Sequence, residues 1–168
     1  MKTRQATLAD AKEIAALHAA SWRSFYRGEL SDAFLDGDIL AERTTVWFSR
    51  LLSAPSQQLV LVAQRSDLLL GFACAYLDSD PAWGTLVDNL HVAESFHRQG
   101  VGASLLSEVL HWSRAKRPSL PIHLWVLQSN MRARAFYESQ GGSVVETDSW
   151  EPPGGGGPLP RFRIVWTR

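Results

Sequence analysis

The segment LVDNLHV at residues 86–92 leads, after five further residues, into RQGVGASLL at residues 98–106. This pattern is typical of a β-strand that passes through a glycine-bearing turn into an α-helix. The first backbone amides of such a helix have no acceptor within it, and they lie at the positive end of the helix dipole. Because Gly100 and Gly102 have no side chains, a diphosphate can approach these amides closely, and Arg98 can add a charged contact. The stretch therefore predicts a site for a phosphorylated ligand.

The glycine spacing excludes two common nucleotide motifs. A nucleoside-triphosphate loop needs a lysine after its last glycine, where this chain has Ala103 followed by Ser104. A dinucleotide fingerprint needs a third glycine at the position of Leu105. Taken alone, the turn fits either a phosphate site or a plain helix-capping turn.

A second informative segment, residues 128–142, follows a predicted strand and forms a helix. Asn130 can cap the start of that helix and still offer an amide to a ligand. Tyr137 lies seven residues further on, so it shares nearly the same helix face. Ala133 lies between them, and its small side chain leaves room for a thin ligand along this face of the helix.

Together the two segments resemble the GCN5-related N-acetyltransferase (GNAT) family, whose phosphate loop reads Gln/Arg-x-x-Gly-x-Gly/Ala. The later helix of that family reads Asn-x-x-Ala-x-x-Phe-Tyr-x-x-x-Gly. The matching residues here are Gly100, Gly102, Asn130, Ala133, Phe136, Tyr137 and Gly141. Residues 17–28 are similar to one common bacterial branch of the family. The resemblance covers essentially the whole chain.

The resemblance implies an acetyl-CoA-dependent N-acetyltransferase that passes acetyl directly to a primary amine, carried by a small molecule or a peptide. The implied coenzyme A site comprises Leu90, His91, Val92, His97, Arg98, Gln99, Gly100, Val101, Gly102, Ala103, Ser104, Asn130, Ala133 and Phe136. The amide near Leu90 would polarise the thioester carbonyl, and Tyr137 would protonate the departing thiolate. A structural alternative for Tyr137 is that it only packs in the core beside Phe136.

Two positions depart from the family pattern. His97 stands where Gln or Arg is usual, and Leu86 stands where many members carry a glutamate that acts as the general base. Asp88 is the nearest carboxylate on the same strand parity, so we expect Asp88 or a water chain to deprotonate the amine. His91 has a better reference pKa for this task, but strand alternation predicts that it points to the other face. Asp88 could equally bridge neighbouring loops.

The acceptor side is predicted at the end of the first helix, where Trp22 and Tyr26 stand with Arg23 and Arg27. These residues could hold an anionic or aromatic amine, or Trp22 and Tyr26 could simply pack the helix onto the sheet. Residues 151–158 are too rich in Gly and Pro for regular structure. They read as a loop that is either a plain connection or a flap beside the acceptor, together with Trp150.

The remaining pattern predicts an α/β (α+β) fold, with a mixed, mostly antiparallel sheet of about seven strands flanked by four helices. Strands are expected at residues 2–6, 59–63, 69–77, 85–92, 122–126, 143–147 and 161–167, with 78–81 as a loop. The first helix is expected to start at Thr7 as its N-cap, with Asp10 as the acidic residue three positions later, and Gly28 ends that helix or the short loop after it. Further helices are expected at 39–53, 100–117 and 130–140. Leu40 and Leu52 are predicted on the apolar face of the second helix.

Composition narrows the function classes. A length of 168 residues fits one domain, residues 1–168, and a formal net charge of 0 disfavours a nucleic-acid partner. A single cysteine, Cys74, cannot form an internal disulfide or a thiolate metal site, so we expect no metal and a cytoplasmic location. No membrane partner is expected, and seven tryptophans leave room for a homodimer. The rival function is an acyl-CoA-binding regulatory module with little turnover, which the loss of the glutamate at Leu86 favours.

Overall fold

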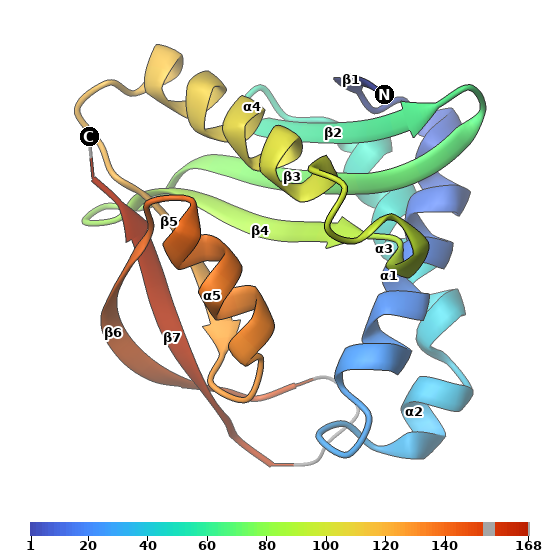
Figure 1. Cartoon of the computed structure of the whole chain (residues 1–168). Coiled ribbons are helices and arrows are strands. Elements are labelled where there is room, and N and C mark those ends of the chain that lie inside the picture. Colours follow the sequence, from blue (N-terminus) through green and yellow to red (C-terminus); the bar gives the residue numbers. More distant parts are fainter. Residues whose placement is uncertain (153–156, 168) are drawn as a thin grey trace.

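The computed structural model describes residues 1–152 and 157–167. In this part of the chain, seven strands form one sheet in the order β1-β2-β3-β4-β5-β7-β6, with five α-helices around it (Figure 1). The strands are β1 Lys2–Gln5, β2 Gln58–Arg65, β3 Leu68–Asp80, β4 Gly84–Val92, β5 Ile122–Leu127, β6 Ser143–Trp150 and β7 Leu159–Trp166. The helices are α1 Ala11–Phe25, α2 Asp32–Asp36, α3 Ile39–Ser53, α4 Val101–Lys116 and α5 Met131–Ser139. Within the described residues, no helix is both long and apolar enough to cross a bilayer.

The predicted fold class is confirmed. All neighbouring strands run antiparallel except β4 and β5, which are parallel. The prediction of four flanking helices misses α2, a five-residue helix capped by Ser31, whose Oγ accepts from the amide of Phe34 at 3.3 Å. So short a helix leaves no measurable periodicity in the sequence.

The sheet separates two apolar layers. α1 and α3 pack on one face, against Val60, Val62, Phe72 and Cys74. α4 covers the other face, where the alternating residues Leu59, Leu61, Ala73 and Ala75 join Tyr137 of α5 (Figure 1). The strict alternation along β2 and β3 explains both layers, since successive side chains point to opposite faces.

Several predicted boundaries shift. β3 continues through Asp80, so the predicted loop at 78–81 is mostly strand. Thr7 and Asp10 form the predicted capping box, but they cap a 3₁₀ turn at Leu8–Asp10 that precedes α1. Of the predicted loop 151–158, residues 153–156 lie outside the described part, and so does any flap role for them.

α3 has the predicted bounds but a different buried face. Leu40 and Leu52 are 43% and 75% exposed, which contradicts their predicted burial. The buried positions are Ile39, Arg43, Trp47 and Leu51, which follow one another at intervals of four. Because Arg43 is charged, the pattern of apolar residues did not include it, and the predicted buried face was rotated by part of a turn from the observed one.

Candidate active site

A cavity of about 1060 Å³ opens where β4 and β5 separate. In the described part of the chain, these strands pair only at Thr85 with Ile122 and at Leu86 with His123. Beyond Leu86 they diverge, as Figure 1 shows. The backbone of Leu90 to Val92 therefore pairs with β3 on one side and faces the cavity on the other. An unpaired strand edge of this kind can hydrogen-bond an extended ligand.

The start of α4 forms a second wall of the cavity. Gly100 caps the helix with a φ of +81°, and Arg98 also adopts a positive φ, +62°. These turns direct the amides of Val101, Gly102 and Ala103 outward, where the helix provides them with no acceptor. Such a group of free amides at the positive end of a 16-residue helix binds anions.

Tyr137 comes from α5 and closes the cavity on the side of α4. It packs edge-on against Phe136 and Trp166 and is 9% exposed, yet it also lines the cavity. Burial raises the pKa of the Tyr137 phenol well above its ordinary value, and the nearby hydroxyl of Tyr26 raises it further. Tyr137 therefore stays protonated and can donate a proton at neutral pH.

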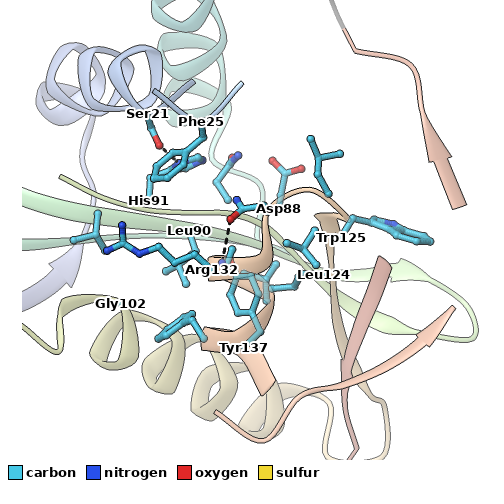
Figure 2. A pocket seen from close by; sticks show the side chains of 18 of the residues that line it. Ser21, Phe25, Asp88, Leu90, His91, Gly102, Leu124, Trp125, Arg132 and Tyr137 are labelled. Carbon is cyan, nitrogen blue, oxygen red and sulfur yellow. Dashed lines mark hydrogen bonds between the residues drawn. The ribbon is translucent and has the colours of Figure 1, made fainter. Parts of the chain in front are cut away.

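An irregularity in β4 determines where Asp88 points. Val87 pairs with Ala75 and Asn89 pairs with Cys74, so Asp88 is an extra residue, a β-bulge. Its Oδ2 accepts from Nη1 of Arg50 in α3 at 2.7 Å. Asp88 and His91 consequently lie on one side of β4, while Leu90 and Tyr137 lie on the other (Figure 2). The prediction that alternation separates Asp88 from His91 is wrong because the bulge changes the strand parity.

His91 is held by the first helix. Its Nδ1 lies 2.8 Å from Oγ of Ser21, a hydrogen bond drawn as a dashed line in Figure 2, and its ring centre lies 4.5 Å from that of His18, with the rings tilted by 40°. Burial lowers the pKa of His91 to about 4, and the charge of Arg43 contributes. The imidazole is therefore neutral at physiological pH. His18 beneath it is fully buried and accepts from Nε1 of Trp47 at 3.0 Å.

Comparison with known proteins identifies the family to which the chain belongs. The family described as Acetyltransferase (GNAT) matches residues 14–142, more than three quarters of the chain. The chain belongs to the GNAT family of acetyltransferases. A probable N-acetyltransferase of Mycobacterium tuberculosis is 26% identical over 159 residues, which cover 92% of this chain and 87% of that protein. An uncharacterised N-acetyltransferase of Bacillus subtilis is 27% identical, with coverages of 90% and 85%.

Solved structures share the fold over nearly the full length. The PaiA N-acetyltransferase of Thermoplasma acidophilum, solved in complex with coenzyme A, has a TM-score of 0.78 at 19% identity, covering 98% of both chains. Arabidopsis thaliana NAA60, solved with a bisubstrate analogue, has a TM-score of 0.73 at 18% identity, covering 98% of this chain and 96% of that one. At these identities the likeness concerns the fold.

Most residues that the GNAT resemblance implies line the one cavity. The exceptions are Gln99, whose amide donates to the carbonyl of Ser95 at 2.9 Å, and Ser104, which lies further along α4. His97 lines the cavity, but its Nε2 bonds the carbonyl of Val92 at 2.8 Å and so fixes the loop to the end of β4. Asn130 accepts from the amide of Ala133 at 3.0 Å, which confirms the predicted cap.

The predicted acceptor residues serve both as packing and as cavity wall. Trp22 is 7% exposed and packs with Leu30 and Leu35. Trp22, Tyr26 and Trp150 contact one another at ring centroid distances of 5.2–6.1 Å, and all three line the cavity. The predicted structural and acceptor-side interpretations of Trp22 and Tyr26 are therefore compatible.

Four arginines of the site were not predicted. Arg43 and Arg50 of α3, Arg132 of α5 and Arg161 of β7 all line the cavity. A signal was present for the first two, because they lie seven residues apart and flank the buried Trp47 on the same helix face. Arg161 stacks 4.2 Å from the ring of Trp125 across two strands, a contact that no local pattern could reveal.

Proposed function

We propose that this protein transfers the acetyl group of acetyl-CoA to a primary amine by direct attack, without a covalent enzyme intermediate. One observation carries the proposal: the free amides of α4, the free edge of β4 and the protonated Tyr137 face a single cavity. The GNAT relative solved with coenzyme A and the one solved with a bisubstrate analogue support this choice of cosubstrate.

The residues present fit the cosubstrate in charge and shape. The amides of Val101, Gly102 and Ala103 would bind the diphosphate, with Arg98 beside them. The free edge at Leu90 to Val92 would hydrogen-bond the pantetheine arm, and an amide near Leu90 would stabilise charge on the thioester oxygen. Bound acetyl-CoA supplies an activated acyl group as a thioester.

Tyr137 is the proposed general acid. As the new C–N bond forms and the C–S bond breaks, its phenol would give a proton to the thiolate. Its raised pKa keeps that proton available at neutral pH. Since its ring is also packed in the core, replacement by phenylalanine keeps the packing and removes only the hydroxyl.

The amine must lose a proton to a base, and we assign this step to Asp88, directly or through water. Asp88 is the one carboxylate among the described residues of the cavity wall. If His91 took this proton it would become a cation, which its burial and the charge of Arg43 oppose, whereas Asp88 would become neutral. As a neutral imidazole fixed by Ser21, His91 would instead accept a hydrogen bond and orient the amine.

The alternative function is an acyl-CoA-binding regulatory module with little turnover. Leu86 in place of the usual glutamate favours it. The buried and protonated phenol of Tyr137 favours the enzyme, since a pure binding protein has no use for a thiolate-protonating group.

A binding assay and a turnover assay separate the two functions. Acetyl-CoA at 100 times its Kd should stabilise the fold by about 2.7 kcal/mol, which raises Tm by roughly 5–10 °C. Release of free CoA in the presence of an amine panel then identifies the enzyme. Tyr137→Phe should keep the thermal shift and lose about 100-fold or more in kcat. A normal thermal shift with no CoA release for any amine would establish the regulatory module.

A further inference from the structure

The part of the cavity wall formed by α3, β4 and β7 presents more positive than negative side chains to a substrate. Arg43 and Arg50 come from α3 and Arg161 from β7, whereas Asp88 is the one carboxylate on the described wall. Arg43 pairs with Glu42 and Arg161 pairs with Asp148, but neither acid lines the cavity. A molecule in this space therefore contacts the guanidinium groups of Arg43 and Arg161, but not the carboxylates with which they pair.

Arg43 has the environment of a built anion site. The residue is 9% exposed, and its guanidinium lies 4.5 Å from the ring centre of Trp22. Its Nε and Nη2 donate to the carboxylate of Glu42, which fixes the plane of the group. Nη1 has no partner among residues 1–152 and 157–167, although the side chain lines the cavity. An immobilised guanidinium with free N–H groups binds a carboxylate better than a flexible one.

The charge of Arg43 reaches the reaction centre. It is the charged group that lowers the pKa of His91, beyond the effect of burial. Arg50 adds a second positive charge next to Asp88, since its Nη1 donates to Asp88 at 2.7 Å and to Asn89 at 2.8 Å. Both arginines thus bring positive charge to the side of the cavity where Asp88 and His91 lie.

The rings beside Arg43 form an aromatic cluster in the cavity wall. Tyr26 lies 5.2 Å from Trp22 and 6.1 Å from Trp150, with the Trp22 and Tyr26 rings nearly perpendicular. Burial raises the pKa of Tyr26 to about 12, so the ring contributes a neutral hydroxyl. Such an apolar wall suits a short hydrocarbon chain between an anion and an amine.

From this arrangement we propose that the acceptor is a small primary amine carrying a carboxylate, and that Arg43 binds this carboxylate. The inference rests on the proposed function and narrows its substrate class. Arg43 is a specificity residue in this scheme, since it holds the part of the acceptor that does not react.

The test uses matched acids and amides. β-Alanine, γ-aminobutyrate and 6-aminohexanoate are compared with their primary amides, which removes the charge and keeps the chain length. Two quantities are measured: kcat/KM from CoA release, and the increase in Tm that each amine gives to the CoA-loaded protein. At least one acid should exceed its amide by about tenfold or more in kcat/KM, and should give the larger thermal shift.

Variants assign the preference to Arg43. Arg43→Gln should bring the acid-to-amide ratio close to one without changing the Kd for acetyl-CoA, and Arg43→Lys should retain part of the preference. Arg117→Gln is the matched control, because Arg117 also pairs with a carboxylate, Asp78, but lies outside the cavity wall. If Arg43→Gln fails to fold, the native protein and Arg43→Lys still decide the question.

The outcomes separate this inference from the proposed function. Equal rates and equal thermal shifts for acids and amides would overturn the carboxylate site even if turnover is fast. A peptide N-terminus that outperforms every small acid would overturn the small-molecule acceptor. If no amine releases CoA, the enzyme proposal fails, while a thermal shift confined to the acids would still uphold the anion site at Arg43.

Discussion

At the scale of single residues, Asp88 and His91 show how surroundings divide tasks between neighbouring polar groups. His91 is enclosed by Phe72, His18 and Ser21, so that the charged imidazolium is excluded. Asp88 keeps half its carboxylate free, because Arg50 engages Oδ2 only. The group that can carry a negative charge thus meets the amine, and the neutral ring beside it can form a hydrogen bond but does not take up the proton.

Asp88→Asn tests this division through the pH dependence of turnover. At neutral pH the variant should lose about 100-fold in kcat, since the amine then arrives protonated and the amide cannot take its proton. The loss should shrink as pH rises toward ~10, where the free amine predominates. Turnover is measured from pH 6 to pH 10, with His91→Gln as a comparison. A profile for Asp88→Asn that parallels the native one would remove Asp88 from the mechanism.

At the scale of elements, the junction between the β4–α4 loop and α4 depends on one glycine for its backbone and another for its space. Gly100 has a φ of +81° with nothing near its missing side chain. Gly102 is helical, and a methyl group there would lie 3.4 Å from the ring of Phe136, an ordinary contact. A side chain at Gly100 would therefore strain the backbone, whereas the fold has room for one at Gly102, where it would only narrow the space left for a ligand.

Substituting each glycine separates these two effects. Gly100→Ala should lower the free energy of unfolding by about 1 kcal/mol, since a left-handed residue with a side chain is strained, and should abolish most of the thermal protection by acetyl-CoA. Gly102→Ala is the control for the fold, and should leave stability unchanged or raise it by up to about 1 kcal/mol. Urea unfolding measures both. Equal stability of Gly100→Ala and the native chain would show that the turn does not impose this conformation.

The same elements show which features of the site can be predicted from the sequence. The start of α4, its glycines and the cap at Asn130 were predictable because local chemistry fixes them. The bulge at Asp88 was not predictable. Strand alternation assumes that successive residues point to opposite faces, and nothing in the sequence marks the extra residue that breaks this pattern. Arg43 was missed for a third reason: a charged residue is assigned to the surface until Trp22 and Glu42 are known to surround it.

At the scale of the whole molecule, three histidines with lowered pKa values should make the fold sensitive to mild acid. Burial lowers the pKa of His91 and His123 to about 4, and that of His18 further still. In the unfolded chain each would titrate near ~6.5. Below that pH the unfolded state binds protons that the folded state excludes, so stability falls as pH falls. The carboxylates with lowered pKa, such as Asp10 at about 2, add to the loss only below about pH 4.

The slope of stability against pH measures this linkage. Three such histidines give a slope approaching about 4 kcal/mol per pH unit between pH 6 and pH 5, from urea unfolding at fixed ionic strength. His123→Gln should reduce the slope by roughly a third, and its amide oxygen can still accept from Nη1 of Arg163, which lies 3.0 Å from Nδ1 of His123. His111→Gln, on the exposed face of α4, should leave the slope unchanged. Because the slope compares proton binding in the two states, it stays informative even where His123→Gln lowers overall stability. Unfolding that is independent of pH between 6.5 and 5 would mean that these rings are charged, or hydrated, within the folded protein.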